Sequence, residues 1–261
     1  MRVLPAPTYV ISDSHLGFAK PAVERSLIRF IRHLAGRAGS LVINGDLFEF
    51  WFEWRHVMPR RAFRVLAALA DLKDSGVPIL MVAGNHDCWG GDLLQRDVGI
   101  DYQLDAWDGL LGGWRARVEH GDGLREREDR KYRALRTVLR NPLAIRAFRW
   151  IHPDIGSALA NRSSNTSRTY VARDGGAGLR LIAEQRLRAN SQLELLIFGH
   201  SHVADLRRVG NGVYANAGSW LDQPTFLKIT PGRVELQRWS DESGEGVHVD
   251  ALDRVSEKAL P

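Results

Sequence analysis

The segment Tyr9-Val10-Ile11-Ser12-Asp13-Ser14-His15 ends an apolar run with two potential metal ligands. The apolar, β-branched residues predict a short buried strand, and Asp13 and His15 follow where that strand ends. Side chains alternate along an extended chain, so residues two apart point the same way. Together they offer a cation one carboxylate oxygen and one imidazole nitrogen. Taken alone, the pair is equally typical of a solvated turn.

Four further segments repeat this arrangement, because each carries a strand-like run into Asp, Asn or His, in each case beside glycine. These segments are 41–46, 79–87, 117–122 and 195–202. Strand ends at one edge of an α/β sheet converge in space, so we expect these side chains to form a single cluster. A cluster of carboxylates and imidazoles needs a cation. Its mixture of nitrogen and oxygen ligands favours Mn, Fe, Zn or Co over Ca or Mg.

This ordered set of motifs resembles the calcineurin-like metallophosphoesterases, over residues 10 to 220. The motifs are Asp13-x-His15, Gly45-Asp46, Gly84-Asn85-His86-Asp87, His120-Gly121-Asp122 and Gly199-His200-x-His202. The resemblance implies an α/β fold, namely a four-layer α/β/β/α sandwich of two mixed sheets with a helical cap insertion. It also implies two metal ions that share Asp46. One ion would be bound by Asp13, His15, Asp46 and His202, and the other by Asp46, Asn85, His120 and His200.

The resemblance further implies the chemistry. Two divalent cations, which we expect to be manganese with iron, zinc or cobalt as alternatives, promote hydrolysis of phosphoesters and phosphoanhydrides. No side chain becomes covalently attached to the substrate. The expected catalytic residues are Asp46 and His86. His86 would lie beside the scissile group, as a donor to a phosphate oxygen or as the acid for the leaving group, oriented by Asp87 or Asp122.

Length and composition bound the remaining organisation. With 261 residues, 44% of them hydrophobic, the chain is long enough for one sizeable core. We expect a metallophosphoesterase domain over residues 1–240, an inserted helical cap at 124–168 and a loose C-terminal tail at 241–261. The formal charge of +5 suits an anionic, phosphorylated substrate, and we expect no nucleic-acid partner. A single cysteine, Cys88, and no signal-like or membrane-spanning run predict a cytoplasmic protein.

The predicted cap interleaves arginine with apolar residues, so it is expected to form short amphipathic helices. Such helices beside the metal cluster predict a cover over the active site, or a surface for anionic lipid headgroups at the inner membrane face. An arginine-rich solvated face is an equally good interpretation of the same pattern. The expected substrate-binding residues of this region are Tyr132, Arg162, Asn165 and Arg168.

Within the superfamily, the chain resembles the UDP-2,3-diacylglucosamine hydrolases of lipid A biosynthesis. The resemblance lies in Gly-Asp-Leu-Phe-Glu at 45–49, in Tyr132 after the His-Gly-Asp motif, and in the basic insertion with Arg162 and Asn165. It implies cleavage of a nucleotide-linked lipid, UDP-2,3-diacylglucosamine, to UMP and 2,3-diacylglucosamine 1-phosphate. A cap with apolar walls would then hold the acyl chains.

Two further hypotheses remain open. The subfamily usually has arginine where this chain has His86, and Gly-Asp-Asp where it has Phe52-Glu53-Trp54. A phosphate leaving group departs without protonation, whereas an alkoxide is helped by an acid, so His86 favours a broader phosphodiesterase or phosphatase. The other hypothesis is a non-catalytic scaffold of the same fold. The seven intact ligand positions argue against it.

Overall fold

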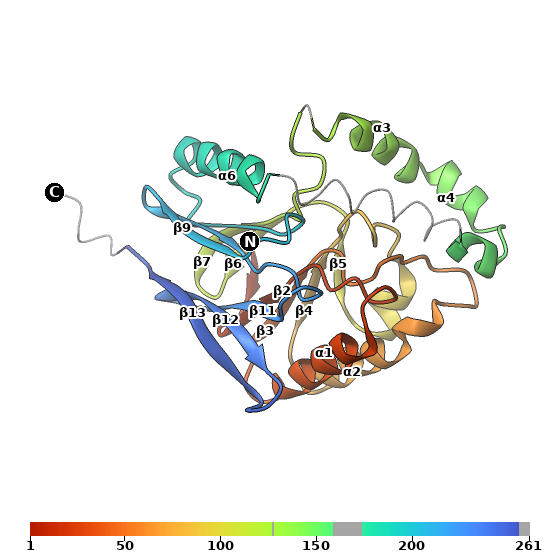
Figure 1. Ribbon diagram of the computed structural model, residues 1–261, viewed down its shortest axis with the longest axis horizontal. Coiled ribbons are helices and arrows are strands. Elements are labelled where there is room, and N and C mark those ends of the chain that lie inside the picture. The colour runs from red at the N-terminus through yellow and green to blue at the C-terminus, as the bar shows by residue number, and fades with distance from the viewer. Residues whose placement is uncertain (127, 159–173, 256–261) are drawn as a thin grey trace.

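The computed structural model describes residues 1–126, 128–158 and 174–255, and shows two β-sheets with helices on their outer faces (Figure 1). Both sheets mix parallel with antiparallel pairs, which confirms the predicted α/β class. The seven-stranded sheet contains, in order, β13 (Glu245–Asp253), β12 (Arg233–Ser240), β11 (Thr225–Thr230), β2 (Thr8–Ile11), β3 (Ser40–Asn44), β4 (Ile79–Val82) and β5 (Asp101–Gln103). The six-stranded sheet contains β1 (Arg2–Leu4), β6 (Trp107–Leu111), β7 (Trp114–Val118), β8 (Leu195–Phe198), β10 (Gly212–Asn216) and β9 (Asp205–Val209).

The central strands are apolar at successive positions because both of their faces are covered. Val10 and Val42 point into the core between the two sheets, where they join Ile197 of the facing sheet. Their neighbours Ile11 and Ile43 point the other way, into a second core beneath helices. Burial on both faces is the usual reason that parallel strands form continuous hydrophobic runs.

Three helices complete the layers. Helices α1 (Pro21–His33) and α2 (Phe63–Asp74), the latter entered through a 3-10 turn at Arg60–Ala62, cover the seven-stranded sheet. Helix α6 (Ala177–Ala189) covers the six-stranded sheet, with Leu179 and Ala183 packed in a cluster with Phe198 and Tyr214. The order of layers is therefore helix, sheet, sheet, helix, as predicted.

In the described part of the segment expected to form a cap, helices α3 (Arg130–Leu139) and α4 (Pro142–Phe148) lie to one side of the sandwich (Figure 1). Residues 153–158 are helical as well. The Asn141 side-chain oxygen accepts hydrogen bonds from the backbone N–H groups of Leu143 and Ala144, at 2.8 and 3.4 Å, so α4 begins directly after α3 ends. Residue 127 and residues 159–173 lie outside the described part of the chain. The boundaries 124–168 therefore stay a prediction.

The prediction of a loose tail over residues 241–261 is wrong for Glu245–Asp253, which forms strand β13. This strand pairs with β12 from end to end, with one register shift at Leu236 and Gln237, so most of its length is held by backbone pairing. Arg233 contacts Asp253 at 2.9 Å and Arg254 contacts Glu194 at 2.6 Å, which attaches the end of the strand. An exposed edge strand needs no apolar run, so the polar sequence of β13 gave no strand signal. Residues 256–261 lie outside the described part.

The strand ends that carry the predicted ligands belong to both sheets rather than to one. Strands β2, β3 and β4 of the seven-stranded sheet lead into Asp13, Asp46 and Asn85. Strands β7 and β8 of the facing sheet lead into His120 and His200. The candidate site is therefore formed where corresponding ends of the two sheets meet.

Candidate active site

The backbone is strained at the predicted ligands. Within the described ranges 1–126, 128–158 and 174–255, every non-glycine residue with positive φ is one of them: Asp13 (51°), His15 (46°), Asp46 (52°), His200 (61°) and His202 (59°). This left-handed conformation costs a non-glycine residue about 1–3 kcal/mol and persists only where the surroundings enforce it. Five such residues at one set of strand ends indicate a functional site.

Neighbouring loops enforce these conformations through backbone hydrogen bonds. The His15 N–H donates to the carbonyl oxygen of Asp46 at 2.9 Å, and the Asp13 N–H donates to that of Gly45 at 3.1 Å. Leu16 N–H donates to Leu47 at 2.9 Å, which extends the pairing beyond the strands. The first two motifs are therefore held together by their backbones, and the Ser12 hydroxyl, which donates to the carbonyl oxygen of Asn44 at 3.0 Å, adds a side-chain contact.

Glycine precedes three of the candidate ligands, Asp46, Asn85 and His200, because no side chain fits there. A Cβ atom on Gly45 would lie 2.2 Å from Nδ1 of His120, and one on Gly84 would lie 2.1 Å from Oδ1 of Asp46. Both distances are far inside van der Waals contact. Glycine thus lets the two sheets bring their ligands together.

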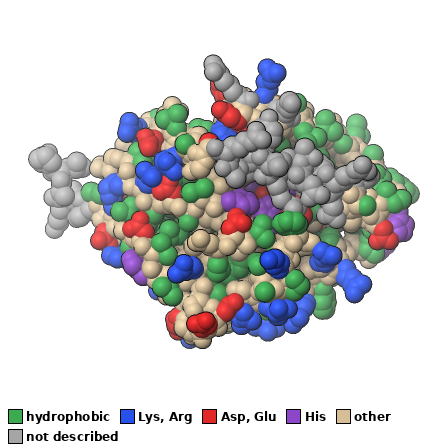
Figure 2. All heavy atoms as spheres, in the orientation of Figure 1, with side chains coloured by type: hydrophobic (Ala, Val, Ile, Leu, Met, Phe, Trp, Pro, Cys, Tyr) green, Lys and Arg blue, Asp and Glu red, His purple; other side chains and the backbone are tan. Residues whose placement is uncertain are grey.

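The ligand atoms form two adjoining groups. In the first group, His202 Nε2 lies 3.2 Å from His15 Nε2 and 3.5 Å from Asp13 Oδ1. The second group is Asp46, His120 and His200, and its Asp46 Oδ2 lies 3.3 Å from His120 Nε2. The same Oδ2 lies 3.8 Å from His15 Nε2, so Asp46 stands between the groups. Figure 2 shows histidine side chains at the surface near the centre of one face.

The donor set fits divalent cations. Asp13 Oδ1, Asn85 Oδ1 and His120 Nε2 are buried side-chain atoms without a hydrogen-bond partner. Each comes from a different strand end. Unsatisfied buried polar atoms are rare because each costs desolvation free energy, and a cation bound among them would recover that cost. Mixed nitrogen and carboxylate oxygen ligands suit transition metals.

In the second group, the pKa of each side chain depends on its charged neighbours. Burial alone would raise the pKa of Asp46, but His120 and His86 hold it well below its usual value. Burial alone would lower the pKa of His120, but Asp46 raises it well above the usual value. For His200, burial and the nearby His120 lower the pKa to about 4, so this imidazole is neutral and suited to bind a metal.

Three of the candidate ligand histidines are oriented by contacts at Nδ1. His15 Nδ1 lies 3.1 Å from Oε2 of Glu49, and His202 Nδ1 lies 3.0 Å from Oδ2 of Asp222. His120 Nδ1 lies 2.8 Å from the backbone carbonyl oxygen of Asn44. Each contact leaves Nε2 directed into the cluster. Sequence analysis assigned no role to Glu49 or Asp222. Glu49 had a signal, because it ends the Gly-Asp-Leu-Phe-Glu motif and lies in an aromatic run, whereas Asp222 had none.

His86 lies at the edge of the first group, with its ring centroid 4.9 Å from that of His15. Its N–H donates to Asp46 Oδ1 at 2.9 Å, and its Nδ1 lies 2.8 Å from the carbonyl oxygen of Glu49 and 3.7 Å from the Glu49 carboxylate. The sequence predicted Asp87 or Asp122 in this orienting role. The Asp87 oxygens instead accept from the N–H groups of Gly84 and Leu47, both at 2.8 Å.

An aromatic cluster joins the sandwich to the cap helices. Phe52 and Trp89 lie 4.8 and 5.1 Å from Phe148 of α4 between ring centroids. Two indole N–H groups add direct ties, because Trp89 donates to the carbonyl oxygen of Leu139 at 2.6 Å and Trp54 to that of Ile151 at 3.0 Å. The cap is therefore attached by rings that carry a polar end.

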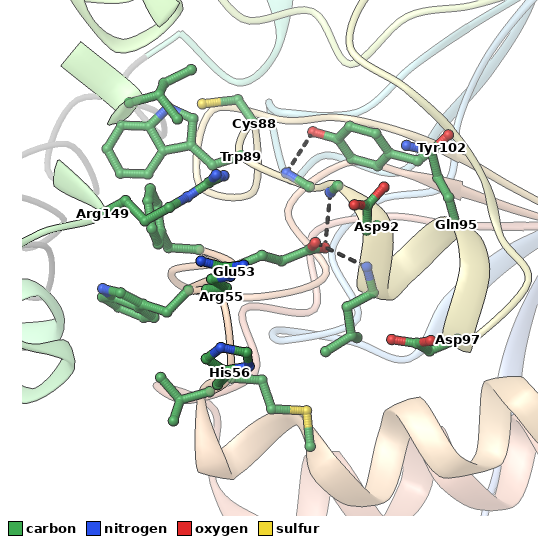
Figure 3. Close-up of a pocket in the computed structure, with 18 of the residues that line it drawn as sticks. Glu53, Arg55, His56, Cys88, Trp89, Asp92, Gln95, Asp97, Tyr102 and Arg149 are labelled. Carbon is green, nitrogen blue, oxygen red and sulfur yellow. Dashed lines mark hydrogen bonds between the residues drawn. The ribbon is translucent and has the colours of Figure 1, made fainter. Parts of the chain in front are cut away.

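A cavity of about 930 Å³ opens beside this cluster (Figure 3). Trp89 and Arg149 stand on one side of it, and the Glu53 side chain extends from the centre toward the side of Asp92. The Glu53 carboxylate accepts from the N–H groups of Gly91 and Leu93, at 2.8 and 3.0 Å, and so fixes the loop that enters the π-helical turn Leu93–Asp97. Apolar rings with a few charged groups are typical of pockets for amphiphilic ligands.

Of the four predicted substrate-binding residues, Tyr132 lies in the described part. Its hydroxyl donates to Asp122 Oδ2 at 2.6 Å, next to the His120 motif. Arg162, Asn165 and Arg168 lie outside the described residues. None of the described helices is long and apolar enough to cross a membrane.

The two-sheet sandwich and the ligand-rich strand ends define a class of protein, the metal-dependent hydrolases of phosphoesters. A model of the calcineurin-like phosphoesterase family matches residues 6–204, and the chain belongs to this family. Members of the family use divalent metals, and the groups described above are the candidate ligands here.

Three similar proteins extend this comparison. The UDP-2,3-diacylglucosamine hydrolase of Porphyromonas gingivalis is 31% identical over 75% of this chain and 82% of that protein. The protein of the same name from Pseudomonas fluorescens is 29% identical over 97% of this chain and 98% of its own. The crystal structure of Vps29 from Chaetomium thermophilum matches 95% of this chain and 97% of that chain, with 12% identity and a TM-score of 0.48.

Proposed function

We propose that the chain cleaves the pyrophosphate bond of UDP-2,3-diacylglucosamine, giving UMP and 2,3-diacylglucosamine 1-phosphate. The observation that carries this proposal is that one chain combines a strained, ligand-rich cluster with an aromatic cavity under the cap, whose lining residues Phe52 and Trp89 follow Glu49 and His86, respectively, by three residues. The substrate has both an anionic pyrophosphate and apolar acyl chains, so it needs a site of this double character. Relatives of that name at about 30% identity support the assignment.

The proposed cofactor is a pair of divalent cations, with manganese as the expected metal. The first would be held by Asp13, His15, Asp46 and His202, and the second by Asp46, Asn85, His120 and His200. When bound, such a pair offsets negative charge on the phosphoryl group and activates water for attack. The three unsatisfied buried donor atoms and the neutral His200 support this set.

The chain's own residues would orient and polarise the substrate. Asp46 Oδ2 lies between the two groups of candidate ligands, so it would fix the position of one group relative to the other. The His86 ring is held by the Glu49 carbonyl oxygen and carboxylate, which would fix it as a donor to a phosphoryl oxygen. Tyr132, Arg162, Asn165 and Arg168 stay candidates for contacts with the nucleotide and sugar.

The proposed cellular place is the cytoplasmic face of the inner membrane, where the cap would touch the lipid surface. Several large apolar side chains of the cap are exposed: Leu135 (46%), Val138 (58%), Leu143 (73%), Trp150 (89%) and Ile155 (57%). Arginines lie between them in the sequence. Apolar residues flanked by basic ones favour a bilayer with anionic headgroups.

A second candidate, a broader phosphodiesterase, is favoured by His86 itself. Its Nδ1 lies 2.8 Å from the Glu49 carbonyl oxygen and 3.7 Å from the Glu49 carboxylate, so the ring is held in place to act as the acid for an alkoxide leaving group. Pyrophosphate cleavage needs no such acid.

The deciding experiment compares two substrates under the same conditions with added Mn²⁺. UMP release from UDP-2,3-diacylglucosamine is measured beside hydrolysis of an aryl phosphodiester, for the natural chain and for His86→Arg. The proposal expects strong preference for the lipid and retained lipid cleavage in the variant. Preference of the natural chain for the aryl ester would favour the second candidate and end the first.

A further inference from the structure

The two groups of ligands differ in what stands behind their histidines. In the first group, His15 and His202 each have a carboxylate at Nδ1, from Glu49 at 3.1 Å and Asp222 at 3.0 Å. In the second group, His120 has a neutral carbonyl oxygen there, from Asn44 at 2.8 Å. The difference is one of charge, because all three contacts fix the same ring nitrogen.

A carboxylate behind an imidazole does more than orient it. Both partners accept the Nδ1 proton and so present Nε2 to the metal, but the carboxylate also makes the imidazole a stronger electron donor. Its negative charge attracts the cation as well, most strongly where water is excluded. A backbone carbonyl supplies only the orientation.

Two carboxylates lie near the second group besides Asp46, and both already have partners, since the Asp87 oxygens accept from two backbone N–H groups. Asp122 lies beside this group, and its Oδ2 accepts the Tyr132 hydroxyl at 2.6 Å and lies 3.8 Å from the Arg136 guanidinium. The charge of Asp122 is therefore partly offset by the cap helix. It does not restore the balance between the groups.

We propose that Glu49 and Asp222 are positioning residues that make the metal centre unequal, so that the group of Asp13, His15 and His202 binds its cation first and more tightly. This inference rests on the proposed function only in requiring that both groups bind divalent metal. Glu49 is expected to matter more than Asp222, because the Glu49 side chain is 3% exposed and that of Asp222 is 59% exposed.

The test is calorimetric titration of the full, metal-free chain with Mn²⁺. The natural chain is expected to show two binding events of unequal affinity. His202→Ala should remove the tighter event, and His200→Ala should remove the weaker one, which assigns the events to the groups. Asp222→Asn should weaken the tighter event by about 10-fold, within the range usual for such outer contacts, and leave the weaker event unchanged.

Two further variants sharpen the titration. Glu49→Gln should weaken the tighter event more, toward about 100-fold, but Glu49 also lies with His15 and His86 in a group that could ligate directly. Asp222→Asn is therefore the cleaner variant, since Asp222 is exposed. The matched control is Asp154→Asn, an exposed aspartate 3.8 Å from His152, which should change neither event.

The outcomes separate the inference from the proposed function. Two events of equal affinity, or a weaker event that responds to Asp222→Asn as strongly as the tighter one, would overturn the inference and leave the hydrolase assignment intact. A chain that takes up no Mn²⁺ while folded would overturn both.

Discussion

The ligand-bearing strand ends and the cap helices are built in opposite ways. At the strand ends, Asp13 and Asp46 are 0% and 2% exposed, and their backbone angles are fixed by neighbouring loops. In the cap, Leu143 and Trp150 are 73% and 89% exposed. Substitution of a buried side chain with many contacts usually lowers stability or activity, whereas substitution of an exposed side chain usually changes them little. We therefore expect substitutions at the strand ends to lower the rate of hydrolysis. Substitutions in the cap are expected to change which substrates are hydrolysed.

The largest effect is expected from Asp46→Ala. Because Asp46 Oδ2 lies between both groups of candidate ligands, its loss should lower kcat for UMP release by more than about 1,000-fold. This effect is larger than that of removing one hydrogen-bond donor that stabilises a transition state, which lowers kcat by about 100- to 1,000-fold. Circular dichroism should show the fold retained. Asp108→Ala, on the exposed side of β6, is the control and should keep full activity. Activity near the natural level in Asp46→Ala would contradict the central role given to this carboxylate.

Removal of the metal should affect the strand ends and spare the cap. A chelator is expected to abolish turnover and lower the unfolding free energy by about 2.7 kcal/mol, relative to metal supplied at 100 times its Kd. Thermal unfolding with and without Mn²⁺ measures this. Readdition of Mn²⁺ should restore both quantities. A melting temperature indifferent to chelator and metal would count against a bound cation.

Gly84→Ala tests how tightly the strand ends are packed. The added Cβ would meet Asp46 Oδ1 at 2.1 Å, so the backbone must shift, at a cost of about 1–3 kcal/mol in unfolding free energy. Metal affinity should fall as well, since Asp46 is displaced. Gly232→Ala is the matched control, because no atom lies within 4 Å of its Cβ position. Equal stability of the two variants would mean that the strand ends tolerate movement.

The smallest effects are expected in the cap. Phe148→Ala removes a half-buried ring from the aromatic cluster and should lower the unfolding free energy by about 1 kcal/mol. Hydrolysis of the diacylated substrate should decline, while that of a small aryl ester is unchanged. Trp150→Ala should alter the unfolding free energy by no more than about 0.5 kcal/mol. A parallel loss of both activities in Phe148→Ala would show that the cap and the strand ends are not separable.

The strand ends that carry the candidate ligands could be predicted from the sequence because each is a local pattern, whereas the layers were predicted from the resemblance to the calcineurin-like metallophosphoesterases. A strand and the ligand that follows it are consecutive in the chain, so Asp13, Asp46 and His120 could be recognised from their neighbours. Hydrophobic runs without alternation likewise indicated strands that are covered on both faces. Whether the metal is manganese, and how many ions bind, stay predictions.

What the sequence could not predict depends on distant pairing. Glu49 orients a histidine 34 residues away, and Asp222 orients one 20 residues away, so neither contact could be inferred from neighbouring residues, although Glu49 ends the Gly-Asp-Leu-Phe-Glu motif. The strand pairs β9–β10 and β11–β12 both consist of antiparallel strands joined by a short turn that contains glycine. They nevertheless belong to different sheets, because β10 pairs with β8 and β11 pairs with β2. Strand β13 was missed because an edge strand can be polar.

The chain leaves the sandwich for the cap after β7 and returns to it through α6 and β8, and β7 and β8 are paired neighbours. An insertion whose two ends meet at adjacent strands can be lengthened, shortened or exchanged without altering the register of either sheet. During evolution, the sequences of the sandwich and of the cap can therefore change at different rates. The residues that recognise the substrate can change while the candidate metal ligands stay the same.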